Sequence, residues 1–173
     1  MSPLTSAVAA VISDASGRVL LCQQSQGHRL WSLPGGKIRS AESPVHAVIR
    51  DVLEETGVQT EVVDLVGIYQ LTGDACGDDL PDVLVHVFRA QLDGVEVTVN
   101  APSRICRLSW HDPDMLPHPL TPTARAAVAD ATAGRSGVLR RVERDAGPEI
   151  PDATDGTEAP IPAQVSVFAA QAS

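Results

Sequence analysis

The chain has 173 residues, of which 43% are hydrophobic and 3% aromatic, and its formal net charge is −9. This length suits one compact domain with an appendage better than two full domains. So acidic a surface repels phosphate backbones and anionic lipids, which argues against a dedicated nucleic-acid binder and against binding to an anionic membrane surface. It does not exclude a small phosphorylated ligand, because a bound divalent metal reverses the local field. Three widely spaced cysteines without a CxxC pair predict reduced thiols in a cytoplasmic protein.

The chain begins with a hairpin pattern. Residues 6–13 and 18–23 are rich in small and β-branched side chains and flank a turn at residues 14–17, so both are predicted strands. Residues 30–33 predict a further short strand, which Pro34 and two glycines end. Two adjacent glycines allow a sharp turn and let another group approach the backbone closely.

Residues 43–56 predict an amphipathic helix. Ser43 is a typical N-cap, Pro44 fits the first helical position, and Gly57 supplies the C-terminal stop. Apolar residues recur at helical spacing and are expected to form one stripe against the core: Val45, Val48, Ile49 and Val52.

The second half predicts four more strands and one helix. Strands are expected at residues 61–71, 83–92, 95–99 and 105–110, and a helix from residue 121 to Gly134. Strands, helix, strands and helix in this order predict an α+β fold and not a repeating βαβ series. The domain is expected to span residues 1–134. Residues 135–173, rich in Pro, Ala and acidic residues, are expected to form a disordered tail.

The predicted helix 43–56 carries a cluster of acids. Asp51, Glu54 and Glu55 lie at i, i+3 and i+4 and should project together, away from the apolar stripe. Carboxylates this close repel one another unless a hard cation lies among them, and Mg²⁺ prefers such oxygen ligands. Arg50 lies one turn before Glu54 and could orient a carboxylate. Taken alone, however, a charged helix face is usually only a solvated face.

A longer pattern changes this weighing. Residues 36–58 resemble the Nudix box: a glycine, five residues, a glutamate, seven residues, then Arg-Glu-apolar-any-Glu-Glu-any-Gly-apolar. The matching positions are Gly36, Glu42, Arg50, Val52, Glu54, Glu55, Gly57 and Val58, and the one departure is Asp51 in place of a glutamate. The resemblance covers roughly residues 6–134 and implies a Nudix-type α/β/α sandwich with a central mixed β-sheet.

The resemblance also implies roles for these residues. Glu54 and Glu55 would be the principal ligands of Mg²⁺, with Mn²⁺ as an alternative, and the Gly36 carbonyl would be a further ligand. Asp51 would bind metal or activate water, and Arg50 would pair with Glu42. The catalytic set is therefore Glu54, Asp51 and Arg50, and the metal set is Glu54, Glu55, Asp51 and Gly36.

Two features leave the activity open. The Asp51 side chain is one methylene shorter, so its oxygens lie roughly 1.5 Å farther back, and a misplacement near 1 Å can cost about 10²-fold in rate. A bridging water or another rotamer could close that gap. Many relatives carry an additional base in the second half, but residues 100–106 contain no acid. Four acids of the polar loop 72–82 could serve as base or could simply be solvated: Asp74, Asp78, Asp79 and Asp82.

Trp31 and Arg39 are the candidate substrate-binding residues. Trp31 could stack on a base, with core packing as the alternative, and Arg39 and Arg104 could contact phosphate or lie on the surface. The predicted function is Mg²⁺-dependent cleavage of the pyrophosphate bond of a nucleoside triphosphate, or of a nucleoside diphosphate linked to another moiety. The alternative is a catalytically weakened Nudix-fold module that binds a nucleotide. The expected partner is a small nucleotide-type molecule, not nucleic acid or membrane, and a homodimer is left open.

Overall fold

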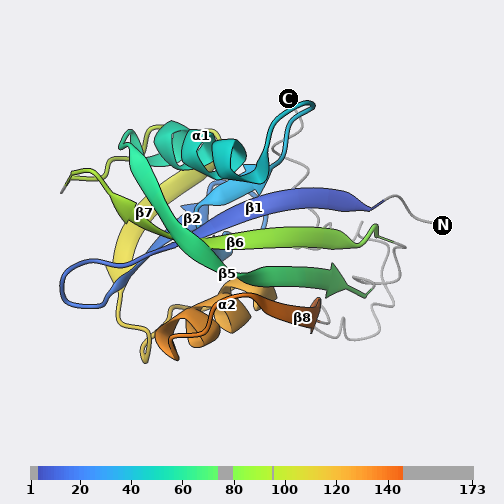
Figure 1. Cartoon of the computed structure of the whole chain (residues 1–173). Coiled ribbons are helices and arrows are strands. Elements are labelled where there is room, and N and C mark those ends of the chain that lie inside the picture. Colours follow the sequence, from blue (N-terminus) through green and yellow to red (C-terminus); the bar gives the residue numbers. More distant parts are fainter. Residues whose placement is uncertain (1–3, 74–79, 95, 146–173) are drawn as a thin grey trace, which may run out of the picture.

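The computed structural model describes residues 4–73, 80–94 and 96–145. Two helices and eight strands lie in this part of the chain, arranged in two sheets (Figure 1). In chain order they are β1 (Thr5–Ile12), β2 (Val19–Gln24), β3 (Trp31–Ser32), β4 (Gly35–Lys37), α1 (Pro44–Thr56), β5 (Thr60–Thr72), β6 (Val83–Leu92), β7 (Ile105–His111), α2 (Pro122–Thr132) and β8 (Val138–Glu143). Neither of the described helices is long and apolar enough to cross a membrane.

The larger sheet is mixed and has the order β4-β1-β6-β5-β8. Strand β1 runs parallel to β6 and antiparallel to β4, whereas β5 runs antiparallel to β6 and parallel to β8. The smaller sheet, β3-β2-β7, is antiparallel. The predicted α+β class with a central mixed sheet is therefore confirmed.

Strand β1 separates two hydrophobic cores because alternate side chains point to opposite faces of a strand. Ala7, Ala9 and Val11 join the core that includes α2 residues Ala124, Ala127 and Val128. Val8, Ala10 and Ile12 join the core that includes α1 residues Ala47, Val48 and Val52. Figure 1 shows the same arrangement, with α1 and α2 on opposite sides of the sheet. This is the predicted α/β/α sandwich.

Helix α1 begins and ends as its sequence predicts. The Ser43 hydroxyl accepts a hydrogen bond from the backbone N–H of His46 at 3.2 Å. Gly57 adopts φ 71° and donates its N–H to the Leu53 carbonyl, which closes the last turn. The expected apolar stripe needs one correction, because Val45 is 41% exposed whereas Val48 and Val52 are fully buried.

Two predicted elements need correction. Residues 96–99 form no strand, although β-branched residues favour one there. The glycines after Pro34 belong to strand β4 and not only to a turn, since Gly35 pairs with Ala9. Beyond residue 134, where the domain is expected to end, β8 (Val138–Glu143) extends the larger sheet by pairing with β5. Its pattern is hard to recognise because the strand lies at the sheet edge and Leu139 is 81% exposed. The expected disorder of the tail falls largely on residues 146–173, outside the described residues.

Candidate active site

The carboxylates of α1 differ in burial. Asp51 and Glu55 are each only 2% exposed, whereas the side chain of Glu54 is 35% exposed. The expectation that all three project away from the core is therefore wrong for Asp51 and Glu55. These two lie one turn apart and are buried beside the apolar stripe of the same helix. We call Asp51, Glu54 and Glu55 the carboxylate face.

Strand β4 lies close to this face. A Cβ atom at Gly35 would lie 2.1 Å from the Val8 carbonyl oxygen, so only glycine allows β4 to approach β1 so closely. The Gly35 N–H donates a hydrogen bond to Glu55 Oε2 at 3.2 Å. Its neighbour Gly36 pairs with Val8 in the β1–β4 ladder. The glycine pair thus lets a buried glutamate reach the backbone of β4.

Arg50 connects the carboxylate face to the loop before the helix. Its guanidinium contacts Glu42 through two bonds, Nε to Oε1 at 2.6 Å and Nη2 to Oε2 at 2.9 Å. The same group contacts Asp51 Oδ1 at 2.9 Å and Glu54 Oε2 at 3.3 Å, and it donates to the Lys37 carbonyl at 3.2 Å. The predicted ion pair between Arg50 and Glu42 is confirmed. Arg50 also touches two members of the carboxylate face, as expected for an orienting group.

Arg104, at the residue before β7, reaches the same face from the other side. Its guanidinium lies 3.0 Å from Glu55 Oε1, 3.2 Å from Glu54 Oε2 and 3.5 Å from Asp51 Oδ1. Sequence reasoning named Arg104 only as a residue that could touch phosphate. Its position among the carboxylates could not be read from a segment 49 residues away from Glu55 in the chain.

Burial and charge shift the carboxylates in opposite directions. The hydrogen bond from Arg50 lowers the pKa of Glu42 to about 2. Burial raises the pKa of Glu55 to about 8, against the opposing effect of Arg104. Burial likewise raises the pKa of Asp51, although Arg50 and Arg104 favour its charged form. Burial therefore disfavours the charged form of both acids, and the adjacent arginines offset this only in part.

The donor chemistry of the face fits a hard divalent cation. Carboxylate oxygens are the ligands that Mg²⁺ prefers, and Asp51 Oδ2 is buried without a hydrogen-bond partner among the described residues. The oxygens of the face are instead paired with arginines: Arg39, Arg50 and Arg104 each contact Glu54. Within residues 4–73, 80–94 and 96–145, no three His, Cys, Asp or Glu side chains converge closely enough to hold a metal. The residue types fit the ion, and the side chains would have to rearrange to bind it.

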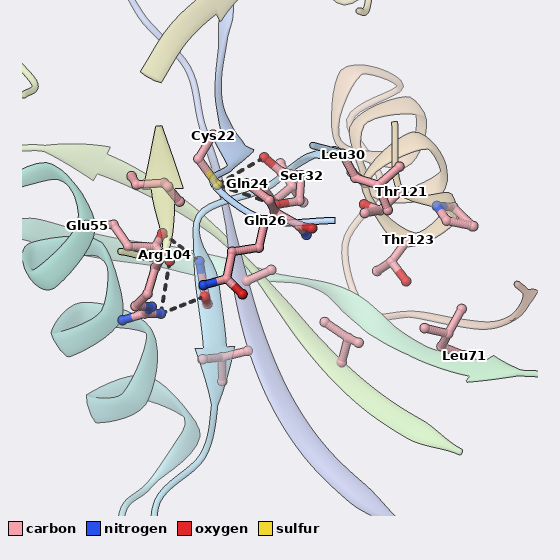
Figure 2. Close-up of a pocket in the computed structure, with 18 of the residues that line it drawn as sticks. Cys22, Gln24, Gln26, Leu30, Ser32, Glu55, Leu71, Arg104, Thr121 and Thr123 are labelled. Carbon is pink, nitrogen blue, oxygen red and sulfur yellow. Dashed lines mark hydrogen bonds and ion pairs between the residues drawn. The ribbon is translucent and has the colours of Figure 1, made fainter. Parts of the chain in front are cut away.

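A cavity of about 70 Å³ adjoins the carboxylate face. Figure 2 shows Glu55 and Arg104 at one end of it, Thr121 and Thr123 at the other, and Gln24 between them. Its lining is mainly apolar and includes Val8, Leu30, Leu33, Leu71, Val85 and Ile105. Both amide atoms of Gln24 and the Thr123 hydroxyl are buried without a hydrogen-bond partner in the described part of the chain. Such atoms are costly unless a ligand or water satisfies them.

The remaining candidate residues lie in varied positions. Trp31 is 6% exposed and packs its ring edge-on against His111 at 5.0 Å, so the structure places it in the core, the alternative to stacking on a base. Arg39 is 60% exposed and contacts Glu54 Oε1 at 3.2 Å, at the outer edge of the site. Asp82 accepts a hydrogen bond from Gln70 and is not among the cavity-lining residues. The other loop acids, Asp74, Asp78 and Asp79, lie outside the described residues.

Comparisons with known proteins agree with this geometry. The NUDIX domain model matches residues 3–131. A MutT-like protein of Streptomyces ambofaciens is 32% identical over 77% of this chain and 80% of its own length. A CTP pyrophosphohydrolase of Escherichia coli is 29% identical over 66% of this chain and 82% of its own. The crystal structure of a MutT NUDIX hydrolase from Burkholderia pseudomallei superposes with a TM-score of 0.67 at 30% identity, covering 74% of this chain and 98% of the other.

The fold has two helices on either side of a mixed sheet, and α1 carries three acids and an arginine that pairs with Glu42 in the loop before the helix. The chain belongs to the NUDIX family. The prediction of a Nudix pyrophosphohydrolase is confirmed at this level, since relatives carry that name.

Proposed function

We propose that the protein hydrolyses the pyrophosphate bond of a nucleotide, with Mg²⁺ as its cofactor and Mn²⁺ as a substitute. The substrate is a nucleoside triphosphate or a nucleoside diphosphate linked to another group. The observation that supports this most directly is the double position of Glu55. It belongs to the carboxylate face and also lines the cavity, so a phosphate chain at the face could extend into a pocket for its organic end.

Glu54 and Glu55 would hold the metal, with Asp51 as a further ligand and the Gly36 carbonyl as an additional one. When bound, Mg²⁺ neutralises phosphate charge, polarises a phosphoryl oxygen and acidifies bound water. A pyrophosphate resists attack without such help because its own oxygens are anionic.

The protein's side chains would orient the reaction and accept its proton. Asp51 is the candidate base, because its Oδ2 is free of hydrogen bonds among the described residues while Arg50 holds Oδ1 at 2.9 Å. A positioned carboxylate of this kind typically contributes about 10²–10⁴-fold to rate. Arg50 also contacts Glu54, so its pairing with Glu42 would hold the carboxylates of Asp51 and Glu54 in fixed positions.

The cavity would bind the organic end of the substrate. At about 70 Å³ it is small beside typical ligand pockets of about 300–1,000 Å³, so it would take one edge of a base, to which its apolar lining and the donor and acceptor of a buried glutamine amide are suited. The Thr123 hydroxyl, buried at the far end, supplies another polar group. Arg39, exposed beside Glu54, is placed to contact a phosphate that projects out of the site.

One relative carries the name CTP pyrophosphohydrolase, which supports a small nucleotide as substrate, whereas others carry the name RNA pyrophosphohydrolase. The net charge of −9 favours a small nucleotide over a long phosphate backbone. We place the protein in the cytoplasm, in keeping with the free thiols of Cys22 and Cys106. Its assembly, monomer or homodimer, is to be measured by sedimentation.

The test is product analysis. The full chain is incubated with Mg²⁺ and a panel of nucleoside triphosphates, sugar-linked nucleoside diphosphates and 5′-triphosphorylated RNA. Release of a nucleoside monophosphate is expected, and it should disappear in Glu54→Gln. The matched control is Glu61→Gln, which removes one exposed carboxylate from β5 and should keep full activity. Equal turnover by Glu54→Gln and the control would refute the proposed metal role.

A nucleotide-binding module is the second candidate. Two observations favour it: the shorter Asp51 and the lack of an acid in residues 100–106, where Arg104 points into the carboxylate face. Saturable nucleotide binding by calorimetry, with no product from any member of the panel, would establish the module and exclude the hydrolase. Retention of both Glu54 and Glu55 is what makes us favour hydrolysis.

A further inference from the structure

Arg104 occupies the centre of the carboxylate face. Its two terminal nitrogens contact one oxygen of each member, at 3.0 Å from Glu55, 3.2 Å from Glu54 and 3.5 Å from Asp51 (Figure 2 shows the contact with Glu55). The side chain is 19% exposed, so these contacts form in a partly desolvated place. The guanidinium thus neutralises three acids at once, as a bound metal ion would.

The main chain of Arg104 is held in place. Its N–H donates to the Ala101 carbonyl at 2.9 Å, and its own carbonyl accepts from the Ser25 N–H at 3.0 Å. The next residue, Ile105, is 3% exposed and begins strand β7. The backbone is therefore anchored, and a change in the position of the guanidinium has to come from rotation of the side chain.

Of the other two arginines near the face, Arg50 contacts the buried Asp51 at 2.9 Å, but neither is paired with Glu55 among the described residues. Arg50 is held by two bonds to Glu42, and Arg39 is exposed and contacts Glu54. Among the ion pairs of the described residues, Glu55 is matched with Arg104 alone. Arg104 is thus the counter-ion of the most buried acid in the site.

A metal ion would need the same oxygens. Mg²⁺ binds carboxylate oxygen at about 2.0–2.1 Å, and the lone pairs of Glu55 Oε1 and Glu54 Oε2 now accept N–H groups of Arg104. Two cations on the same oxygens would repel each other in a site of reduced solvent exposure. Metal and guanidinium therefore compete for this face.

Arg104 has a second environment within reach. It lines the cavity as well as the carboxylate face, and its Nε is buried without a hydrogen-bond partner in the described part of the chain. A planar guanidinium binds phosphate oxygens in pairs. When a metal ion occupies the carboxylate oxygens that Arg104 now contacts, the phosphate of a bound nucleotide would offer Arg104 new hydrogen-bond acceptors.

We propose that Arg104 is a stored cation that neutralises the carboxylate face in the metal-free protein and transfers to the substrate's phosphate when the metal binds. This rests on the proposed function for the identity of the face and of its ligand. It has one consequence that the proposed function alone does not have. The free protein should bind metal weakly, and metal and nucleotide should each strengthen binding of the other, because linkage is reciprocal.

The first test is Mn²⁺ binding without nucleotide, followed by electron paramagnetic resonance, for wild type, Arg104→Gln and Arg107→Gln. Arg107 is exposed on β7, so its variant removes the same charge three residues further along the chain without touching the face. Arg104→Gln should bind Mn²⁺ at least about tenfold more tightly than wild type, and Arg107→Gln should match wild type. Equal or weaker binding by Arg104→Gln, or an equal gain in both variants, would overturn the proposal.

The outcomes separate this inference from the proposed function. If the protein turns over no nucleotide but Arg104→Gln gains Mn²⁺ affinity, the hydrolase proposal fails and the stored cation stands. If turnover is metal-dependent and Arg104→Gln gains nothing, the stored cation fails alone. If neither wild type nor Arg104→Gln binds Mn²⁺, the stored cation fails, and if the protein also turns over no nucleotide, both proposals fail.

A second measurement does not depend on folding of Arg104→Gln. The side-chain Nε–H signal of Arg104 is followed by ¹⁵N NMR in wild type and assigned through its loss in Arg104→Lys. Saturating Mg²⁺ should move this signal, and a methylene-bridged nucleotide analogue added with Mg²⁺ should move it again. A signal that stays in place while backbone amides of α1 respond to Mg²⁺ would contradict the transfer.

Discussion

Arg50 and Glu42 form a two-bond ion pair, with Nε 2.6 Å from Oε1 and Nη2 2.9 Å from Oε2. The pair joins the middle of α1 to the loop that precedes it. The same guanidinium contacts Asp51 and Glu54. The positions of these two carboxylates therefore depend on Glu42, which is not itself part of the carboxylate face.

Glu42→Gln should therefore impair the site without altering a carboxylate of the face. Loss of the charged partner lets Arg50 swing away, and loss of such an outer partner typically lowers metal affinity or activity about 10–100-fold. The measurements are kcat and Mn²⁺ affinity, with Glu61→Gln as the control for loss of one carboxylate. Unchanged values in Glu42→Gln would show that Arg50 does not need this pair.

Asp51→Glu tests the one departure from the Nudix box. The longer side chain brings its oxygens roughly 1.5 Å forward, so we expect kcat to rise by about tenfold or more. Asp51 is 2% exposed, and an added methylene in a packed place usually costs about 1–3 kcal/mol. The melting temperature should fall as the rate rises. A lower kcat in a variant that still folds would mean that the site is built around aspartate.

Gln24→Leu and Thr123→Val test the cavity. Both side chains are buried with unpaired polar atoms, so replacing them should keep or raise stability while removing base recognition. We expect KM for the preferred nucleotide to rise about tenfold or more, with little change in inhibition by methylenediphosphonate, which has no base. Steady-state kinetics across the nucleotide panel measures both. An unchanged KM in each variant would place the base elsewhere.

Asp130 predicts an acid-sensitive contribution to stability. It is 1% exposed and accepts hydrogen bonds from Tyr69 at 2.9 Å, Arg135 at 2.8 Å and Arg140 at 2.7 Å. Burial raises its pKa, but these three donors outweigh burial and hold the pKa at about 2, below its ordinary value of 3.8. The contribution is therefore full above pH 3.8 and is lost as pH falls through about 2.

Asp130→Asn should lower stability at neutral pH by about 2 kcal/mol, since two guanidinium groups lose their shared anion. The difference from wild type should shrink between pH 4 and pH 2 as Asp130 becomes protonated. Urea unfolding at several pH values measures it. Asp112→Asn, at an exposed turn before α2, is the control. A constant difference down to pH 2 would contradict the assigned pKa.

Two truncations test where the domain ends. A chain ending at residue 145 keeps β8 and the contacts of Arg144 with Thr72 and Pro81, so its melting temperature should match the full chain. A chain ending at residue 134 lacks β8 and removes Arg140 from Asp130, and it should lose more than about 3 kcal/mol. The measurement is thermal unfolding of the two truncated chains and of the full chain. Equal stability of the two would make β8 dispensable.

The sequence by itself determined much of the site, because its signals are local. Ser43, Pro44 and Gly57 define α1 through capping and backbone preferences that act within one helical turn. The resemblance to the Nudix box implied the ion pair of Glu42 and Arg50 that the structure has, and the order of strand and helix patterns indicated the α+β class.

Only the tertiary structure decided which groups meet across the chain. The pairing of β8 with β5 joins an exposed edge segment to a strand about 70 residues earlier, and no local pattern encodes that register. The burial of Asp51 and Glu55 depends on how closely β4 approaches α1 and β1. The position of Arg104 depends on β7 pairing with β2, which carries a cation to acids far away in sequence. Helical spacing specifies which side chains share a face of α1. Which opposite charges lie against that face is decided by the packing of distant segments, such as the one that carries Arg104.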